Sequence, residues 1–364
     1  MSRIRFEILP PVDRPEEPLV LCGNVPALGE WDAARGLRLR WEGERHVGLI
    51  EAETGTALEY KVLRGSWEAE AVDAWGSVPP NARHEVWLDA TVYRTVADWK
   101  DRYAGRLTRD RVYSRGLAAW RELLIWLPPG YATHPDQRFP VLYFNDGANV
   151  FDPETSPITK VDLAVDEWVR RLVAERSMRE CLVVGICHPD GFADGMRSER
   201  EVDLSVELGG AAYAQFLATD LVPAIDQRYR TVPKAEARLI GGTALGGLNA
   251  FYTALHHPDV FGRMLGLSTI FGDLSGDEGG GKCGALRMLA GRADLPAGSR
   301  FYFDHGTEGP DAGLGDCHRE LAELLRARGW EDGREFRILR VIGGRHDEAS
   351  WRTRLGDALR FLAG

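Results

Sequence analysis

The chain has 364 residues, of which 44% are apolar and 27% are charged, a composition typical of a soluble globular protein large enough for two domains. Its formal net charge of −10 argues against a nucleic-acid backbone or an anionic membrane surface as a partner. No apolar run is long enough to span a bilayer, so we expect no membrane-embedded part.

Residues 1–9 alternate between polar and apolar side chains, which predicts a strand and not the apolar core of a signal peptide. We therefore expect a reducing, cytoplasmic location. The five cysteines are scattered and form no C-x-x-C pair, so the sequence predicts neither a zinc site nor a disulfide framework; they are Cys22, Cys181, Cys187, Cys283 and Cys317. No H-E-x-x-H, EF-hand or P-loop motif is present, and we expect no metal and no cofactor.

Residues 1–99 contain short strand patterns separated by turn residues. The predicted strands are Arg3–Leu9, Leu19–Cys22, His46–Glu51, Ala57–Val62 and His84–Trp87. Many short strands at this spacing indicate an all-β, immunoglobulin-like sandwich.

Two stretches of this segment resemble the starch-binding carbohydrate modules. Gly23–Asp32 is similar to their G-x-x-x-x-L-G-x-W-D signature, and Glu59–Glu68 followed by Asn81 is similar to their Y-K, W-E and N segment. The resemblance implies a glucan partner that stacks on Trp67 and hydrogen-bonds to Lys61, Glu68 and Asn81; Trp75 and Trp99 are weaker candidates. We expect Trp31 to pack inside the domain, whereas Trp67 fits a core position as well as a binding position.

Residues 100–115 are charged and non-periodic, and we interpret them as a linker or the approach to the next strand. From residue 116 to 364, apolar strand patterns alternate with helical ones. The predicted strands are Leu123–Leu127, Phe139–Phe144, Cys181–Ile186, Ala237–Ile240, Met264–Ser268, Arg300–Phe303 and Phe336–Val341, and the predicted helices are Val161–Glu175, Ala212–Tyr229, Asp316–Arg328 and Ser350–Leu362. This alternation predicts a mostly parallel sheet covered by helices on both faces, as in an α/β hydrolase.

The stretch Gly242-Thr243-Ala244-Leu245-Gly246 follows a predicted strand and opens a helix, which is the layout of the G-x-S-x-G nucleophile elbow. The middle position is alanine, and a methyl group cannot attack a carbonyl. Thr243 is adjacent, but successive residues of a tight turn point in different directions, so we do not expect it to replace the missing hydroxyl.

Several further stretches resemble the putative-esterase family of α/β hydrolases, which includes enterochelin, S-formylglutathione and feruloyl esterases. They are Leu124–Tyr131, Val141–Asp152, Tyr302–Gly309 and Gly343–Arg352, in the family's order with the elbow between them. The resemblance implies His346 as the catalytic base, with His305 as the next candidate. His256 and His257 end a helix, where we expect a structural role.

The acid of the implied triad follows the strand Arg300–Phe303, and the sequence leaves it open. Relatives have G-x-x-D there, but Gly306–Gly309 has glycine in the fourth place, so Asp311, Glu308 and Asp304 all remain candidates. The implied oxyanion hole uses the backbone N–H groups of Leu245 and Ala148. Substrate contacts could also come from Gly279–Gly281, Trp168 or Trp351, although the two tryptophans also fit helix cores.

The sequence therefore supports two interpretations of Ala244. In the first, the chain is a serine-type carboxylic-ester hydrolase, acting on a sugar or aryl-acid ester, whose nucleophile has been replaced so that this chain is inactive. In the second, it is a natural pseudoesterase that binds carbohydrate or regulates without catalysis. The otherwise complete set of triad, elbow and oxyanion positions favours an active parent.

Overall fold

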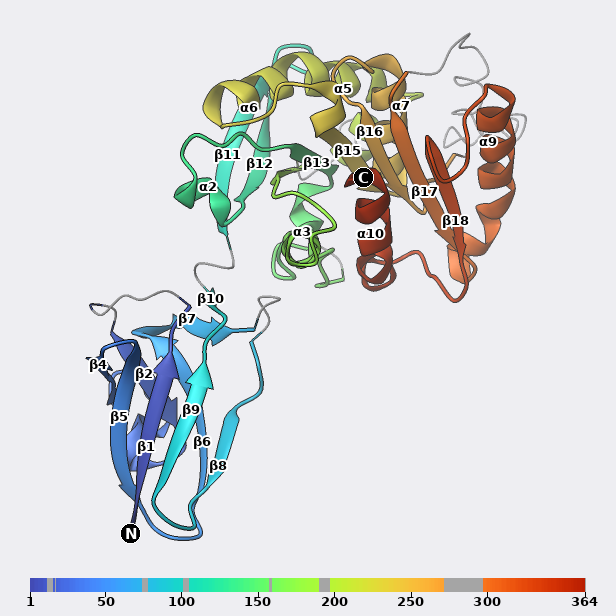
Figure 1. Cartoon of the computed structure of the whole chain (residues 1–364). Coiled ribbons are helices and arrows are strands. Elements are labelled where there is room, and N and C mark those ends of the chain that lie inside the picture. Colours follow the sequence, from blue (N-terminus) through green and yellow to red (C-terminus); the bar gives the residue numbers. More distant parts are fainter. Residues whose placement is uncertain are drawn as a thin grey trace. The chain divides into compact units, whose positions relative to one another are not determined.

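The computed structural model describes residues 1–11, 16, 18–73, 78–100, 105–156, 159–189, 197–271 and 297–363. The chain forms two compact units, Met1–Gly105 and Arg106–Gly364, which are described separately below. Figure 1 colours the first unit blue to cyan and the second cyan-green to red. Trp75 and Gly279–Gly281, both named above as candidates, lie outside the described residues.

The first unit is an all-β sandwich, as predicted. One sheet has the order β4 (Arg40–Glu42), β5 (Arg45–Ala52), β1 (Ser2–Leu9), β9 (Ala90–Thr95). The other has the order β10 (Asp98–Trp99), β7 (Ser66–Val72), β6 (Ala57–Arg64), β2 (Leu19–Gly23), β3 (Leu37–Arg38), with β8 (Ala82–Glu85) also paired to β6. Inward side chains alternate along β1 and β6, so that Phe6 and Tyr60 meet edge to face at 5.1 Å in the core beside the fully buried Trp99.

The second unit is built on an eight-stranded sheet. Its order is β11 (Arg106–Ser114), β12 (Ala119–Leu127), β14 (Leu182–Ile186), β13 (Val141–Asn145), β15 (Arg238–Thr243), β16 (Arg263–Leu267), β17 (Arg300–Gly306), β18 (Phe336–Val341). From β14 to β18 all neighbours are parallel, and β12 is antiparallel to both of its neighbours. The carboxyl ends of these parallel strands therefore share one edge, where ligand sites of such sheets form.

Helices cover both faces of this sheet. The helical elements are α2 (Gly130–Thr133), η2 (Gly147–Asn149), α3 (Val165–Ala174), α4 (Glu199–Leu204), α5 (Gly210–Phe216), η3 (Leu217–Leu221), α6 (Val222–Arg228), η4 (Ala235–Ala237), α7 (Leu245–His256), η5 (Gly309–Gly313), α9 (Gly315–Ala327) and α10 (Glu348–Ala363). Helices α3 and α10 pack together on one face, and α5, α6, α7 and α9 contribute to the core on the other (Figure 1). The α/β-hydrolase prediction is thus confirmed.

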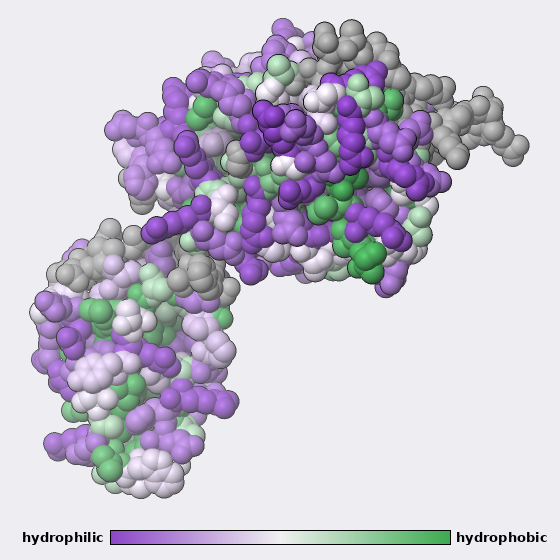
Figure 2. All heavy atoms as spheres, turned by 45° about the vertical axis from the view of Figure 1, so that its right-hand side comes forward, coloured by the Kyte–Doolittle hydropathy of each residue, from purple (hydrophilic) through white to green (hydrophobic). Residues whose placement is uncertain are grey.

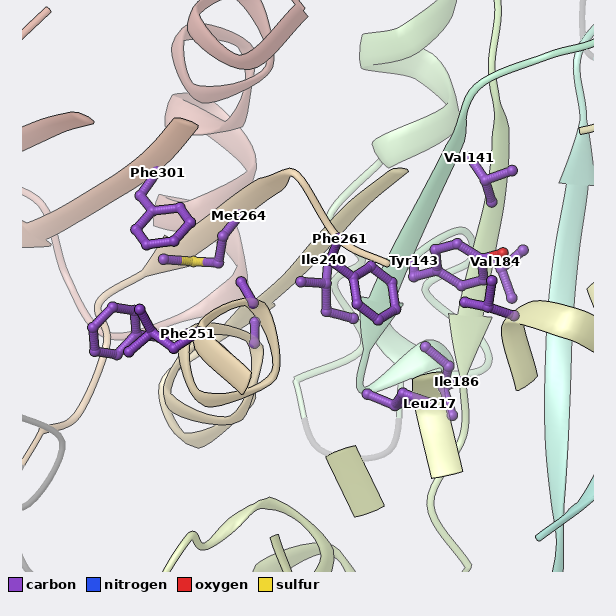
Figure 3. Packing of buried hydrophobic residues seen from close by; sticks show 14 of the residues in the cluster. Val141, Tyr143, Val184, Ile186, Leu217, Ile240, Phe251, Phe261, Met264 and Phe301 are labelled. Atoms are coloured by element: carbon purple, nitrogen blue, oxygen red, sulfur yellow. The ribbon is translucent and has the colours of Figure 1, made fainter. Parts of the chain in front are cut away.

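The core of the second unit explains why the strands of its sheet are nearly continuous apolar runs in the sequence. Figure 3 shows Ile240, Met264 and Phe301 side by side from neighbouring strands, with Phe251 of α7 next to them. Phe251 packs edge to face against Phe301 at 6.0 Å. A parallel sheet buried on both faces requires apolar residues on both, which gives this sequence pattern.

Two sequence predictions need correction. Residues 106–114 of the proposed linker form the edge strand β11, which pairs along its whole length with β12. Its charged residues misled the prediction because one face of this edge strand is exposed to solvent. Cys317 is disulfide-bonded, whereas Cys22 and Cys181 are free thiols. The spacing of the cysteines along the chain did not reveal this disulfide, because the fold decides which cysteines come close together.

The surface contains no large apolar belt in the view of Figure 2, where hydrophilic side chains surround smaller groups of apolar ones. Among the residues that the structure describes, no helix is both long and apolar enough to cross a membrane.

Candidate functional site

Position 244 lies on a strained turn between β15 and α7. Ala244 has φ 52° and ψ −116°, a conformation that residues other than glycine rarely adopt. Its N–H donates to the carbonyl of Leu267 at 2.9 Å, and its carbonyl accepts from the N–H of Leu248 at 3.2 Å. The turn therefore has the form of a nucleophile elbow, with a methyl group where a nucleophile would carry its reactive atom.

Two glycines allow the turn to be this tight. A Cβ on Gly242 would lie 2.4 Å from the carbonyl carbon of Gly246, closer than such atoms can approach. A Cβ on Gly246 would lie 3.0 Å from Oδ2 of Asp146, in the turn that follows β13. This close packing holds residue 244 in its strained conformation whatever its side chain.

His346 and Asp311 meet beyond the ends of β18 and β17. Nδ1 of His346 lies 2.6 Å from Oδ1 of Asp311. Because a carboxylate only accepts, Nδ1 carries the proton and Nε2 of the neutral ring keeps its lone pair. Nε2 has no hydrogen-bond partner within the described part of the chain, and the ring packs edge-on against Trp351 at 5.0 Å. The pair thus presents an oriented basic nitrogen.

Hydrogen bonds fix the carboxylate of Asp311, which is fully buried. Its Oδ2 accepts from Oγ of Ser268 at 2.6 Å and from the N–H of Gly306 at 2.7 Å. Burial alone would raise the pKa of Asp311, but the hydrogen bonds from His346, Ser268 and Gly306 outweigh it and hold the pKa well below its usual range. Asp311 therefore stays ionised.

Ser268 connects this pair to the elbow. It follows Leu267, the residue that accepts the N–H of Ala244, and its hydroxyl reaches Asp311. From α10, Nε1 of Trp351 donates to the same Oγ at 2.8 Å, and Nη2 of Arg354 lies 3.3 Å from Oδ2 of Asp311. The final helix thereby supports the acid from behind.

The other two candidate acids lie elsewhere. Asp304 is buried, accepts from the N–H of Ser268 at 3.2 Å and lies 3.4 Å from Nε of Arg354. Burial, opposed by Arg354, raises the pKa of Asp304 to about 7. Glu308 is exposed, and no contact between it and His346 is found in the described residues. The structure thus brings only Asp311 of the three to His346.

The proposed oxyanion turn follows β13 at η2, with Ala148 at its centre. Asp146 enters it in the left-handed conformation, φ 60° and ψ 50°. Arg200 binds the Asp146 carboxylate through Nε and Nη2, at 2.5 and 2.8 Å. Burial would raise the pKa of Asp146, but the charge and hydrogen bonds of Arg200 lower it overall. Since Asp146 packs on Gly246, this turn adjoins the first turn of α7 where Leu245 begins the helix.

The remaining candidates are placed as follows. Nδ1 of His305 donates to the Gly306 carbonyl at 2.8 Å, and its ring lies against His318 of α9, not against Asp311. His256 stacks on Tyr252 at the end of α7. Nε1 of Trp168 donates to the Arg352 carbonyl at 2.7 Å, so this tryptophan joins α3 to α10.

On the first unit, Trp31 and Trp67 lie together at the surface. Each is 36% exposed, and their ring centroids are 6.5 Å apart with an angle of 34°. The expectation that Trp31 packs inside is wrong. Gly29, Glu30 and Trp31 all have positive φ, so the chain turns sharply here and the tryptophan ring stays at the surface.

A cavity of about 460 Å³ adjoins Trp67, and Trp67 and Glu68 form part of its wall. The other two predicted contacts do not line it. Lys61 forms an ion pair with Glu70 at 3.1 Å and donates to the Pro79 carbonyl, and Nδ2 of Asn81 donates to Glu59 at 3.2 Å. Trp99 is fully buried.

Comparison with known families agrees with this geometry. Residues 114–362, more than half of the chain, match the family model described as Putative esterase. The chain belongs to the Putative esterase family. Residues 1–96 match the model described as Starch binding domain.

The proteins that resemble this chain have low sequence identity to it. A Bacillus subtilis (strain 168) protein described as Uncharacterized protein YjcH is 23% identical over 224 residues, which are 62% of this chain and 85% of that protein. A solved ferulic acid esterase covers 72% of this chain and 98% of its own, at 20% identity and a TM-score of 0.54. The match to the enterobactin esterase FES from Shigella flexneri covers 95% of this chain and 88% of that protein, at 15% identity and a TM-score of 0.53. At such identities the structural likeness shows the fold alone.

Sequence reasoning missed the residues that support the esterase site. Ser268, Arg354 and Arg200 contact Asp311 or Asp146 but belong to no motif used above. One signal was available for Arg354: it lies on the buried face of the final helix, with Trp351 and Leu355, where an arginine needs a charged partner.

Proposed function

We propose that the second unit carries a carboxylic-ester hydrolase site that holds the acyl group on residue 244 when this residue is serine. With Ala244, the chain binds an ester and does not turn it over. The observation that carries this proposal is the His346–Asp311 pair, linked through Ser268 to an elbow that is strained around a methyl group. A strained non-glycine residue costs about 1–3 kcal/mol and persists only where its surroundings enforce it.

With serine at 244, Nε2 of His346 would take the hydroxyl proton as Oγ attacks the ester carbonyl carbon. The backbone N–H groups of Leu245 and Ala148 would stabilise the oxyanion, and His346 would then protonate the departing alcohol. Water, activated by the same histidine, would release the acid. Asp311 would hold Nδ1–H throughout and stabilise the imidazolium. With alanine no acyl-enzyme can form, and only the residual rate from binding and the oxyanion hole is expected.

The substrate class we propose is an ester of an aryl acid or a sugar. Two of the structural neighbours are by name a ferulic acid esterase and an enterobactin esterase, and a starch-binding match precedes the esterase unit here. A sugar-linked ester could then be held on a glucan by the first unit while the second unit binds the ester group.

The experiment that tests this proposal is the Ala244→Ser variant of the full chain, assayed on p-nitrophenyl acetate and methyl ferulate. We expect hydrolysis at least about 10³-fold above that of the Ala244 chain, since triad members act as one unit. Ala244→Gly, which has no hydroxyl, should remain as inactive as the chain itself.

A second variant separates the proposed chemistry from an accidental reactive serine. His346→Ala added to Ala244→Ser should remove the gain in a chain that remains folded, as checked by circular dichroism. An Ala244→Ser chain that folds, binds neither ester and stays inert would refute the hydrolase proposal.

The alternative is a natural pseudoesterase that binds carbohydrate or regulates. The exposed Trp31–Trp67 pair and the alanine itself favour it. This alternative predicts glucan binding by the full chain together with an inert Ala244→Ser form.

A further inference from the structure

The esterase unit has an open cavity with a volume of about 490 Å³, lined by the end of β17, η5, α9 and β18. Its wall includes Gly306, whose N–H supports Asp311, but its charged side chains take no part in the proposed reaction. This is the size of a small-molecule site. Its polar lining includes Arg319, Arg326, Arg340, His305, His318 and Thr307. Neither Ala244 nor His346 contributes to its wall.

The arginines give this cavity an excess of positive charge in a chain whose formal net charge is −10. Two of them are already paired with aspartates of the same wall: Arg319 with Asp316, and Arg326 with Asp332 at 3.0 Å. The guanidinium of Arg340, on β18, makes no ion pair or hydrogen bond with any residue that the structure describes. One guanidinium is therefore available to an anion.

The two histidines of the wall supply hydrogen-bond acceptors, whereas the arginines supply only donors. Nδ1 of His318 lies 3.0 Å from the Leu314 carbonyl, and Nδ1 of His305 lies 2.8 Å from the Gly306 carbonyl. A carbonyl only accepts, so each Nδ1 carries the proton and each Nε2 is an acceptor. His318 is 1% exposed and its Nε2 is inaccessible to solvent, so the acceptor that a ligand in the cavity can reach is Nε2 of His305.

Burial lowers the pKa of His318 to about 4, so its ring is neutral at pH 7. The rings of His305 and His318 are 4.9 Å apart, which places two acceptor side chains together on one side of the cavity. Nε2 of His305 makes no hydrogen bond with any described residue, so it can accept from a group that the protein itself does not provide.

We propose that this cavity binds a small anion that also carries hydroxyl groups, such as a sugar phosphate or a sugar acid. Arg340 binds the anionic group, with the remaining donors of Arg319 and Arg326 beside it. A hydroxyl group of the ligand donates to Nε2 of His305. This binding site is independent of whether residue 244 supports hydrolysis.

Isothermal titration of the full chain, at constant ionic strength, tests the proposal with glucose 6-phosphate, glucuronate, glucose and inorganic phosphate. We expect at least one sugar anion to bind, and the phosphate and carboxylate probes identify which anionic group is preferred. Glucose and inorganic phosphate should bind at least tenfold more weakly, because each lacks half of the recognised chemistry.

The deciding variant is Arg340→Ala, which should weaken the sugar anion at least tenfold. The matched control is Arg337→Ala on the same strand, because Arg337 does not line the cavity and its guanidinium lies over Phe361 at 4.9 Å. Sugar binding at the first unit would not respond to either variant. His305→Phe keeps a planar ring and should weaken binding of the sugar anion while leaving binding of inorganic phosphate unchanged.

Three outcomes would overturn the proposal: no binding of either sugar anion, equal binding by Arg340→Ala and the unaltered chain, or inorganic phosphate as tight as the sugar anions. The last result would mean an adventitious anion site.

Discussion

In the esterase unit the candidate reacting groups are held from several sides, whereas in the first unit the candidate ligand contacts stand exposed at the surface. Asp311 receives hydrogen bonds from a strand end, a neighbouring strand and the final helix, and the elbow is fixed by backbone packing. Trp31 and Trp67 contact each other at the surface, each with about a third of its area exposed.

Because of this difference, we expect the two units to tolerate different substitutions. The esterase geometry is set mainly by backbone and by side chains behind the site, so the residue at 244 can change while the geometry persists. In the first unit the candidate contacts are exposed side chains, Trp31 and Trp67, so removing one should remove its contribution directly. The predictions below test this contrast.

The largest effect is expected from Asp311→Asn in the Ala244→Ser chain. An asparagine cannot stabilise the imidazolium or hold the same tautomer of His346, so kcat should fall by about 10³–10⁴-fold. Initial rates on p-nitrophenyl acetate measure this. Glu308→Gln, which changes an exposed carboxylate three residues earlier, is the control and should alter kcat less than twofold. Equal losses from the two variants would remove Asp311 from its proposed role.

The next effect concerns the backbone of the elbow. Gly242→Ala places a Cβ 2.4 Å from the Gly246 carbonyl carbon, so the free energy of unfolding should fall by about 1–3 kcal/mol or more. Urea unfolding followed by circular dichroism measures the change. Gly116→Ala, where a Cβ would meet nothing within 4 Å, should change stability by less than about 0.5 kcal/mol.

A smaller effect is expected at the aromatic pair. Trp67→Ala and Trp31→Ala should each weaken binding of soluble starch or β-cyclodextrin by about 10–100-fold, since truncating a central aromatic contact costs about 1–3 kcal/mol. Trp87→Ala, which removes a tryptophan that is 66% exposed elsewhere on the same unit, should have no effect. If Trp31→Ala binds soluble starch and β-cyclodextrin as tightly as the unaltered chain, Trp31 has no part in glucan binding.

The last prediction concerns a slope in the pH dependence of stability, which is small over any one pH unit. Asp304 has a pKa raised to about 7 by burial, so between about pH 4 and 7 it is protonated in the folded chain and ionised in the unfolded chain. Unfolding then releases a proton, and the free energy of unfolding should fall as pH rises, by at most about 1.4 kcal/mol per pH unit from this group. Asp304→Asn should lack this component. Denaturant unfolding of both chains at several pH values measures this. If the free energy of unfolding changes with pH equally in Asp304→Asn and in the unaltered chain, the raised pKa of Asp304 is contradicted.

Much of the fold was readable because its signals are local. The alternation of apolar strands and helices predicted the α/β hydrolase, and the strand Phe336–Val341 has the bounds expected. The strand β11 was missed because its exposed face carries charges that imitate a linker. The elbow was found from glycines whose spacing reflects a steric contact within one turn.

The sequence by itself determined the two units, the order of the site segments and the alanine at position 244, because periodicity, glycine spacing and residue identity are properties of short stretches. Only the folded chain shows that Asp311, and not Glu308 three residues earlier on the same loop, contacts His346. The choice depends on Ser268 and Gly306, which reach Asp311 from other strand ends, and on Arg354 of the last helix. The surface position of Trp31 was likewise decided by the folded chain, because the positive φ angles at residues 29–31 leave its ring outside the core.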